Sequence, residues 1–108
     1  MIEGKKSISP GLITNHLTDL SLAYWIMDDG SLQNDKRSMI IHTQSYSKTE
    51  VDLLSSELNM KFSLNSRVIP HKKIYYVIFI PSSDAKLLYN LISPHVHPSM
   101  SYKLPVID

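Results

Sequence analysis

The sequence contains no cysteine and only three glycines among its 108 residues. The absence of cysteine excludes disulfide bonds and thiolate metal sites, and it fits a reducing, intracellular compartment. No apolar run approaches the roughly 18 residues that a membrane-spanning helix needs, so no membrane partner is expected. The N-terminal stretch MIEGKKSISPGL also lacks the apolar centre of a signal peptide. A chain of this length is expected to form a single domain, residues 1–108, around one core.

Acidic residues are scarce in two segments that we expect to contain the strands, residues 30–45 and 61–80. These segments hold one acid, Asp35, against six basic residues: Lys36, Arg37, Lys61, Arg67, Lys72 and Lys73. A basic sheet on a protein of net charge +1 suggests one cationic face, as nucleic-acid-binding proteins have. Lysines at strand edges that only discourage aggregation are the alternative interpretation.

The run LSLAYWIMDDG, residues 20–30, is apolar and ends in two carboxylates. Thr18 fits an N-cap for a helix over residues 19–29, and Gly30 fits its end. Because this helix is apolar over most of its circumference, we expect burial on two sides, the second against another protein or against the chain's own sheet. Carboxylates at a helix C-terminus cost about 0.3–1 kcal/mol each. A compensating feature is therefore expected near Asp28 and Asp29.

The rest of the chain alternates between strand and helix patterns. The stretch GSLQNDKRS, residues 30–38, looks like the start of a strand followed by a turn, and residues 38–45, 61–70 and 72–80 have the composition and alternation of strands. Ser47 and Glu50 form a capping box that predicts a helix between the strands over residues 38–45 and 61–70. The order of helix, two strands, helix, two strands and helix (αββαββα) predicts an α+β fold. Its antiparallel four-stranded sheet would carry the helices on one face.

Helices on one face leave the other face of the sheet open. A two-stranded ribbon fits the DNA major groove, where amide and guanidinium groups read base edges. A plain solvated face is the alternative, because antiparallel sheets commonly have one. The side chains predicted to contact DNA from this face and its last hairpin are Ser38, His42, Gln44, Ser63, Asn65, Arg67, Lys72 and Lys73.

The stretch LAYWIMDDG, residues 22–30, resembles the signature of the LAGLIDADG homing endonucleases. It looks like the variant found in the second motif of organellar, intron-encoded members. The segments IHTQS and MSYKLP resemble segments at the same relative places in those members. Tyr24 stands where the family string has glycine, which leaves the helix packing at that point open. The residues that match the family string are Leu22, Ala23, Ile26, Asp29 and Gly30.

The resemblance implies a sequence-specific, metal-dependent DNA endonuclease in which two motif helices pack together at a dimer interface. Each helix would deliver Asp29 to a scissile phosphate, where Asp29 and the main-chain carbonyl at Asp28 would bind Mg²⁺. Mn²⁺ is expected to substitute for Mg²⁺, and Ca²⁺ is expected to support DNA binding without cleavage. Bound cations would also offset the unfavourable helix dipole. The interface residues of the motif helix would be Leu20, Ala23, Tyr24 and Met27.

The resemblance implies two catalytic residues besides Asp29. Gln44 in HTQS matches a polar residue near the metal-bound water, which it would position, since a neutral amide cannot act as a general base. Lys103 in SYKLP matches a basic residue that would stabilise phosphate charge or polarise a water. A sheet-surface amide and an ordinary surface lysine are the alternatives.

The chain contains one motif, whereas an active enzyme of this class needs two. We expect the chain to act on double-stranded DNA as a homodimer. The alternatives are pairing with a second, different LAGLIDADG subunit and origin as half of a longer protein. The resemblance also implies a mitochondrial location.

Three other functions stay open from the sequence. An RNA-splicing maturase, with intron RNA as its partner, would share the fold and need no metal site. A silent DNA-binding or dimerisation module would bind without cleaving. Zinc binding by His95 and His97 is the third, although no obvious third ligand accompanies them.

Overall fold

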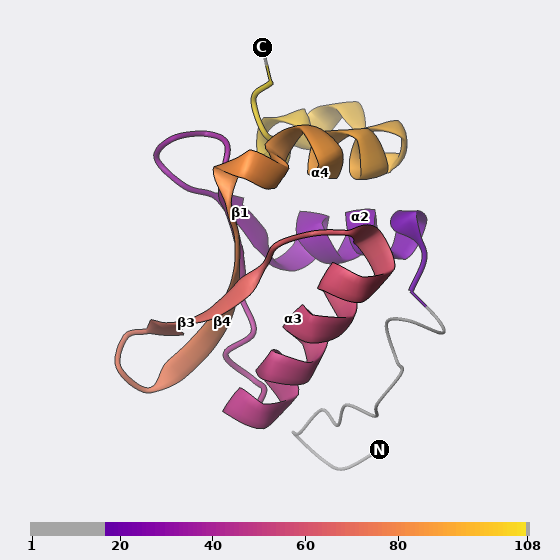
Figure 1. Cartoon of the computed structure of the whole chain (residues 1–108). Coiled ribbons are helices and arrows are strands. Elements are labelled where there is room, and N and C mark those ends of the chain that lie inside the picture. Colours follow the sequence, from indigo (N-terminus) through magenta and orange to yellow (C-terminus); the bar gives the residue numbers. More distant parts are fainter. Residues whose placement is uncertain (1–16, 108) are drawn as a thin grey trace.

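The computed structural model describes residues 17–107 (Figure 1). The predicted αββαββα order is confirmed, with 3₁₀ turns added in the last third of the chain. The turn expected near Pro10 lies outside the described residues. In chain order the elements are α2 (Asp19–Asp29), β1 (Gly30–Leu32), β2 (Met39–Ile41), α3 (Lys48–Phe62), β3 (Arg67–His71), β4 (Tyr75–Ile80), η1 (Ser82–Asp84), α4 (Ala85–Ile92), η2 (Ser93–His95) and η3 (Pro98–Lys103).

The four strands form one antiparallel sheet in the order β1-β2-β4-β3. The three α-helices within residues 17–107 lie on the same face of this sheet, to its right in Figure 1, with α2 between α4 and α3. No helix of the described part of the chain covers the other face, as predicted. No helix in residues 17–107 is both long and apolar enough to cross a bilayer. The core between helices and sheet includes Leu22, Ile26, Met39, Ile41, Leu58, Ile78, Ile80, Leu88 and Ile92.

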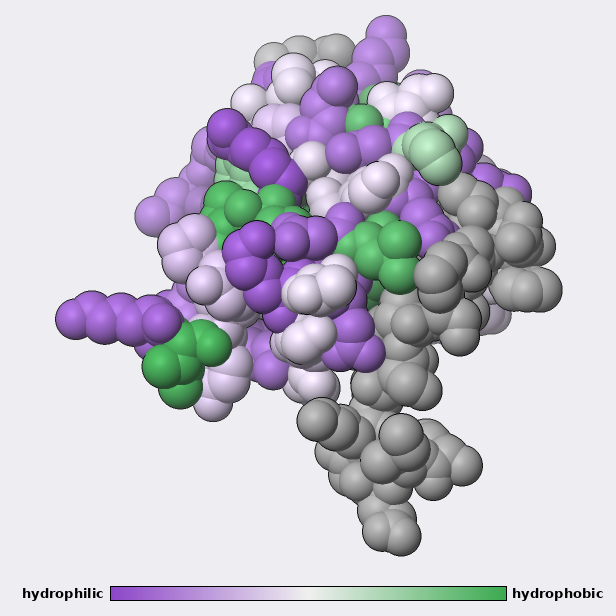
Figure 2. Space-filling model, turned by 60° about the horizontal axis from the view of Figure 1, so that its bottom comes forward, coloured by the Kyte–Doolittle hydropathy of each residue, from purple (hydrophilic) through white to green (hydrophobic). Residues whose placement is uncertain are grey.

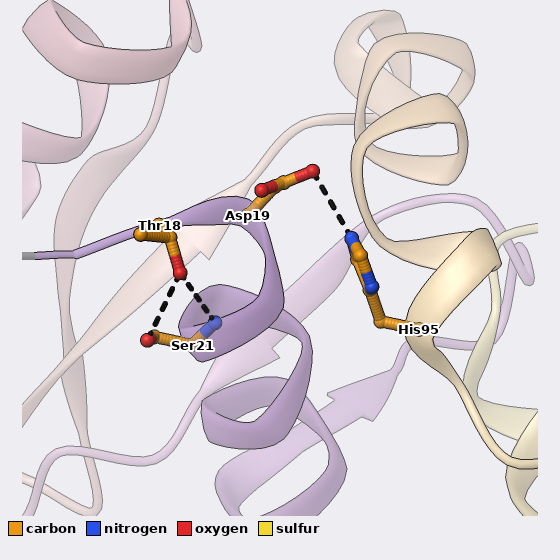
Figure 3. Close-up of polar contacts among 4 residues, drawn as sticks. All are labelled: Thr18, Asp19, Ser21 and His95. Carbon is orange, nitrogen blue, oxygen red and sulfur yellow. Dashed lines mark hydrogen bonds and ion pairs between the residues drawn. The ribbon is translucent and has the colours of Figure 1, made fainter.

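The first turn of α2 is fixed by side chains on both sides of the helix axis (Figure 3). The Thr18 hydroxyl oxygen accepts a hydrogen bond from the Ser21 backbone N–H at 3.2 Å, which confirms the predicted N-cap. The Asp19 carboxylate lies 3.0 Å from Nε2 of His95 in η2. This hydrogen bond lowers the pKa of Asp19 below its ordinary value. The pair therefore ties the segment after α4 to the start of α2.

The other end of α2 stops at Gly30, but not through the left-handed conformation usual for a terminal glycine. Gly30 has an extended backbone, with φ −87° and ψ 149°, and β1 begins at this residue. A Cβ atom at Gly30 would lie 2.7 Å from the Ile26 carbonyl oxygen. Glycine is therefore required here because strand and helix backbones approach closely.

The start of α3 was predicted correctly and its end was not. Ser47 and Glu50 form the capping box, with side chain to backbone distances of 3.2 and 2.9 Å. The helix continues to Phe62, where a strand was expected, and Ser63 ends it in the left-handed region at φ 60°. Asn65 follows in a loop, where its N–H and its side chain both donate to the carboxylate of Asp84. Ser63 and Asn65 are thus not on the sheet, which corrects their predicted placement.

The strand expected over residues 38–45 is reduced to the three residues of β2. Ser38 is buried, and its hydroxyl donates to the Asp35 carboxylate at 2.9 Å, so its predicted exposure on the open face is wrong. The Thr43 hydroxyl donates to the Tyr76 carbonyl oxygen at 2.8 Å. After Ile41 the chain therefore no longer pairs with β4 through its backbone, but the side chain of Thr43 still holds it to β4.

Candidate active site and nucleic-acid interface

The C-terminal end of α2 carries two carboxylates of different exposure. Asp28 is exposed and Asp29 is half-buried. The Lys103 ammonium group donates to the Met27 carbonyl oxygen, and the His42 backbone N–H donates to the Asp29 carbonyl oxygen at 2.9 Å. A cation at a helix C-terminus interacts favourably with the dipole. Lys103 therefore provides part of the compensation for the two carboxylates that the sequence led us to expect.

Three polar side chains form a chain of contacts beside this helix end. Gln44 Nε2 lies 3.4 Å from His42 Nδ1, and His42 Nε2 lies 2.9 Å from the Ser31 hydroxyl oxygen. Because an amide nitrogen only donates, Nδ1 of His42 is the acceptor, and the neutral ring donates from Nε2 to Ser31. This arrangement leaves the carbonyl oxygen of Gln44 available to accept a hydrogen bond from a water molecule.

His42 lies at the centre of the charged groups of this site. Partial burial lowers its pKa, and the neighbouring His71 ring, 5.8 Å away between centroids, lowers it further. Asp29 acts in the opposite direction, whereas Lys103 and Lys72 add to the lowering. Five groups from distant parts of the chain thus share one electrostatic environment. His71 was missed in the sequence because its proximity to His42 depends on the pairing of β3 with β4.

We expect His42 to titrate with a midpoint below 6.5, since its environment favours the neutral ring. The sign of the effect on stability follows from the lowered pKa, because His42 binds its proton more readily in the unfolded chain than in the folded protein. As the pH falls below 6.5 toward the lower folded midpoint, the free energy of unfolding should decrease, and above 6.5 this contribution should be constant. Proton NMR of the ring resonances against pH measures the midpoint. A midpoint at or above 6.5 would contradict the expectation.

The open face of the sheet is less polar than predicted. Val77 is fully buried on this face, and the Arg67 guanidinium lies 5.0 Å from the centre of the Phe79 ring. Arg67 and His42 occupy the face as expected. Lys72 and Lys73 lie in the β3–β4 turn rather than in a strand, and both have left-handed backbones, with φ of 55° and 69°.

The β3–β4 turn projects beyond the sheet at the lower left of Figure 1, and this side of the molecule is also at the left in Figure 2. There, at the left, a long hydrophilic side chain extends beside an apolar one. Lys72 and Lys73 are exposed, and the following Ile74 is 71% exposed. The left-handed conformation of Lys72 and Lys73 would favour glycine or asparagine at these two positions. The presence of lysine there indicates that the positive charge matters more than the geometry of the turn.

The predicted interface residues of α2 divide into two groups. Leu20 is 41% exposed, Tyr24 is 55% exposed, and Met27 is half-buried. Ala23 is fully buried within the chain's own core, so its predicted place in a dimer interface is wrong. The outward side of α2 is therefore a stripe of Leu20, Tyr24 and Met27 that leads to Asp28.

The described residues contain no group of three or more acidic, histidine or cysteine side chains that could enclose a metal ion. Asp28 and Asp29 are nevertheless suitable oxygen donors, because Mg²⁺ needs only one or two carboxylates when waters and phosphate oxygens complete its shell. His95 contacts Asp19, and His97 Nδ1 contacts Ser99 at 2.7 Å. These separate contacts give no support to a shared zinc site on the two histidines.

Comparison with known proteins identifies the family. The family model described as "LAGLIDADG DNA endonuclease family" matches residues 1–88. The chain is 48% identical over 101 residues to the probable intron-encoded DNA endonuclease 3 of Mycosarcoma maydis, covering 94% of this chain and 74% of the relative. It is 44% identical over 105 residues to the probable intron-encoded endonuclease 1 of Wickerhamomyces canadensis, covering 93% of this chain and 45% of the relative.

A solved structure extends the similarity to the whole fold. The homing endonuclease I-WcaI, bound to its DNA recognition sequence, matches with a TM-score of 0.91 and 42% identity. The match covers 100% of this chain and 49% of that chain, so the present sequence spans about half of its length. Together with the family model, these similarities establish that the chain belongs to the LAGLIDADG DNA endonuclease family.

Proposed function

We propose that the chain is one catalytic unit of a sequence-specific, divalent-metal-dependent DNA endonuclease that hydrolyses phosphodiester bonds in double-stranded DNA. One observation carries the proposal: three residues far apart in sequence meet at the end of α2. Asp29 lies at the helix end, Lys103 binds the carbonyl of Met27, and Gln44 is attached through His42. A carboxylate, an ammonium group and a neutral amide are suited to holding a metal, neutralising a phosphate and positioning a water.

The proposed mechanism assigns one task to each residue. Asp29 would hold Mg²⁺ with its carboxylate and Asp28 with its main-chain carbonyl, since the carbonyls of Met27 and Asp29 already accept hydrogen bonds. When bound, the metal supplies an activated water and stabilises charge on the attacking and leaving oxygens. Gln44 would orient the water through its carbonyl oxygen. Lys103 would stabilise the negative charge that develops on the phosphate.

The unit needs a partner to supply the second Asp29-like carboxylate. The stripe of Leu20, Tyr24 and Met27 would pack against the motif helix of a second copy or of a second domain. The matched structure supports this, because its chain is twice as long as the match. Localisation in the mitochondrion stays a prediction, supported by the intron-encoded origin given in the names of the relatives.

We expect the substitution Tyr24→Asp to weaken self-association at least about tenfold, because it buries an unpaired charge in the proposed interface. Sedimentation velocity of the wild type and the variant at micromolar concentration measures this, with and without DNA. Met60→Asp is the matched control, since Met60 is 70% exposed on α3 and outside the stripe. A wild type that stays monomeric in both conditions would contradict the homodimer and favour a different second subunit.

The function is tested by incubating the chain with a library of duplex DNA and sequencing the ends produced. We expect cleavage at a defined sequence with Mg²⁺ or Mn²⁺, binding without cleavage with Ca²⁺, and no cleavage with a chelator. Binding without cleavage in every metal would indicate a silent DNA-binding module. Intron splicing in a parallel assay, without duplex cleavage, would indicate a maturase.

A further inference from the structure

A cavity of about 250 Å³ lies beside the proposed active site, between β1, the β1–β2 turn and η3. This volume is below the roughly 300–1,000 Å³ that enclose a drug-sized ligand, so the cavity suits a small group. Of the residues that line it, Lys103 alone has a role in the catalytic proposal, and none is among the predicted open-face contacts. Its lining residues are Gly30, Ser31, Leu32, Lys36, Tyr102 and Lys103.

The polar groups of this cavity suit an anion. Two lysines and no acidic residue line it. The acid next to Lys36 in sequence, Asp35, is turned toward the N–H groups of Arg37 and Ser38, at 2.9 Å each. Ser31, whose hydroxyl group is hydrogen-bonded to the His42 ring at 2.9 Å, adds a polar side chain to the lining. The lining thus offers two ammonium groups and one hydroxyl group.

The two walls of the cavity are held together by the backbone. Lys36 lies in the left-handed region at φ 61°, which is uncommon for a residue with a side chain. Its N–H donates to the Gln33 carbonyl at 2.9 Å, and its carbonyl accepts from the N–H of Val106 at 2.8 Å. The segment after η3 therefore fixes the turn that presents Lys36. Such over-determined, strained residues cluster at ligand sites.

An aromatic ring lies at the rim of this positive cavity. Tyr102, in η3, is 68% exposed and lines the cavity. A free inorganic anion would make no use of an exposed ring. A strand of duplex DNA uses both features, because its phosphates bind cations and its sugars offer apolar surface to an aromatic ring.

We propose that this cavity binds a backbone phosphate of the DNA strand next to the phosphate presented to Asp29. Lys36 and Ser31 contact its oxygens, Lys103 lies between it and the phosphate presented to Asp29, and the ring of Tyr102 packs against the adjacent sugar. The site rests on the proposed function for the identity of the strand, but not for the binding of phosphate. Its effect is to fix the position of the strand along the active site independently of base sequence.

The first test uses inorganic phosphate as the probe and backbone amide NMR of the full chain as the readout. Phosphate should shift the amide resonances of Gly30, Ser31 and Tyr102 in the wild type. These shifts should be lost in Lys36→Gln and retained in Lys36→Arg. Lys86→Gln, a neutralised exposed lysine on α4, is the matched control and should behave as the wild type. No shift, or equal shifts in Lys36→Gln and Lys86→Gln, would overturn the site.

The second test measures the affinity for a duplex oligonucleotide against salt concentration without metal. Lys36→Gln should reduce the slope of log affinity against log salt by about 0.9, the value for one lost phosphate contact, and Lys86→Gln should not. Tyr102→Ala should weaken binding without changing the slope. An unchanged slope in a variant that has lost phosphate shifts would show that the cavity takes a free anion, which overturns the strand assignment.

The two tests also separate this site from the proposed function. Phosphate shifts and a reduced slope without any Mg²⁺-dependent cleavage would reject the endonuclease and keep the phosphate site. Cleavage that is intact, with no dependence on Lys36 in either test, would reject the site and keep the endonuclease. Tighter, Lys36-dependent binding to single-stranded RNA than to duplex DNA would overturn the assignment to DNA.

Discussion

Replacing Asp29 with asparagine should reduce Mg²⁺-dependent DNA cleavage by at least about 100-fold, because metal ligation and the activation of water depend on its charge. The fold and the affinity for DNA should stay nearly unchanged, since asparagine has the same shape and the Asp29 carbonyl still accepts from His42. Cleavage rates on the selected duplex, with binding measured in Ca²⁺, give the two quantities separately.

The matched control for this prediction is the neighbouring acid. Asp28→Asn should retain most of the activity, because Asp28 is exposed and its proposed contribution comes from its main chain. Equal activity in Asp29→Asn and the wild type would reject the catalytic assignment. Equal loss in both variants would show that the two carboxylates act together.

Replacing Gly30 with alanine should lower the free energy of unfolding by about 1–3 kcal/mol, as expected when an atom is forced into a well-packed region. The added methyl group would lie 2.7 Å from the Ile26 carbonyl oxygen, which belongs to the helix backbone and cannot move aside alone. Without this contact, alanine would stabilise the chain by about 0.4–1 kcal/mol through the unfolded state. The sign of the measured change therefore tests the geometry directly.

Thermal unfolding measures this effect, with a decrease of about 4–8 °C in Tm expected for each kcal/mol. Ser45→Ala, at an exposed loop residue, is the control and should change stability by no more than about 0.5 kcal/mol. Cleavage by Gly30→Ala at a temperature where it is folded should also fall, because the clash displaces Asp29. A stability equal to or above that of the wild type would contradict the close approach.

The starts of α2 and α3 were predicted to the residue, because the signals are local. Thr18, Ser47 and Glu50 bond to backbone groups within one turn of the helix. The end of α3 was not predictable in this way. The loop after it is stabilised by Asp84, which lies 19 residues beyond Asn65 in the sequence. The apolar and polar residues that alternate over residues 61–70 led us to predict a strand there. In the structure the loop that holds Asn65 is instead stabilised by hydrogen bonds to Asp84.

The errors at the site have a common physical reason as well. A helix that is apolar all round does not reveal which side its own sheet covers, so Ala23 was assigned to the outward side although it is buried. Ser38 had a local signal that was overlooked. The spacing from Asp35 to Ser38 fits a turn closed by an aspartate side chain, which is what the structure contains.

The contact between Lys103 and Met27 has a consequence for the timing of assembly. The last fully buried residue of the core cluster is Ile92 in α4, yet the ammonium group at the end of α2 arrives only with the eleven residues that follow it. During synthesis, the sheet and the helices up to α4 would thus be complete before Lys103 reaches the end of α2. The proposed nuclease activity would then depend on the docking of residues 93–103. Proteolytic removal of this segment should abolish the activity while the sheet stays folded.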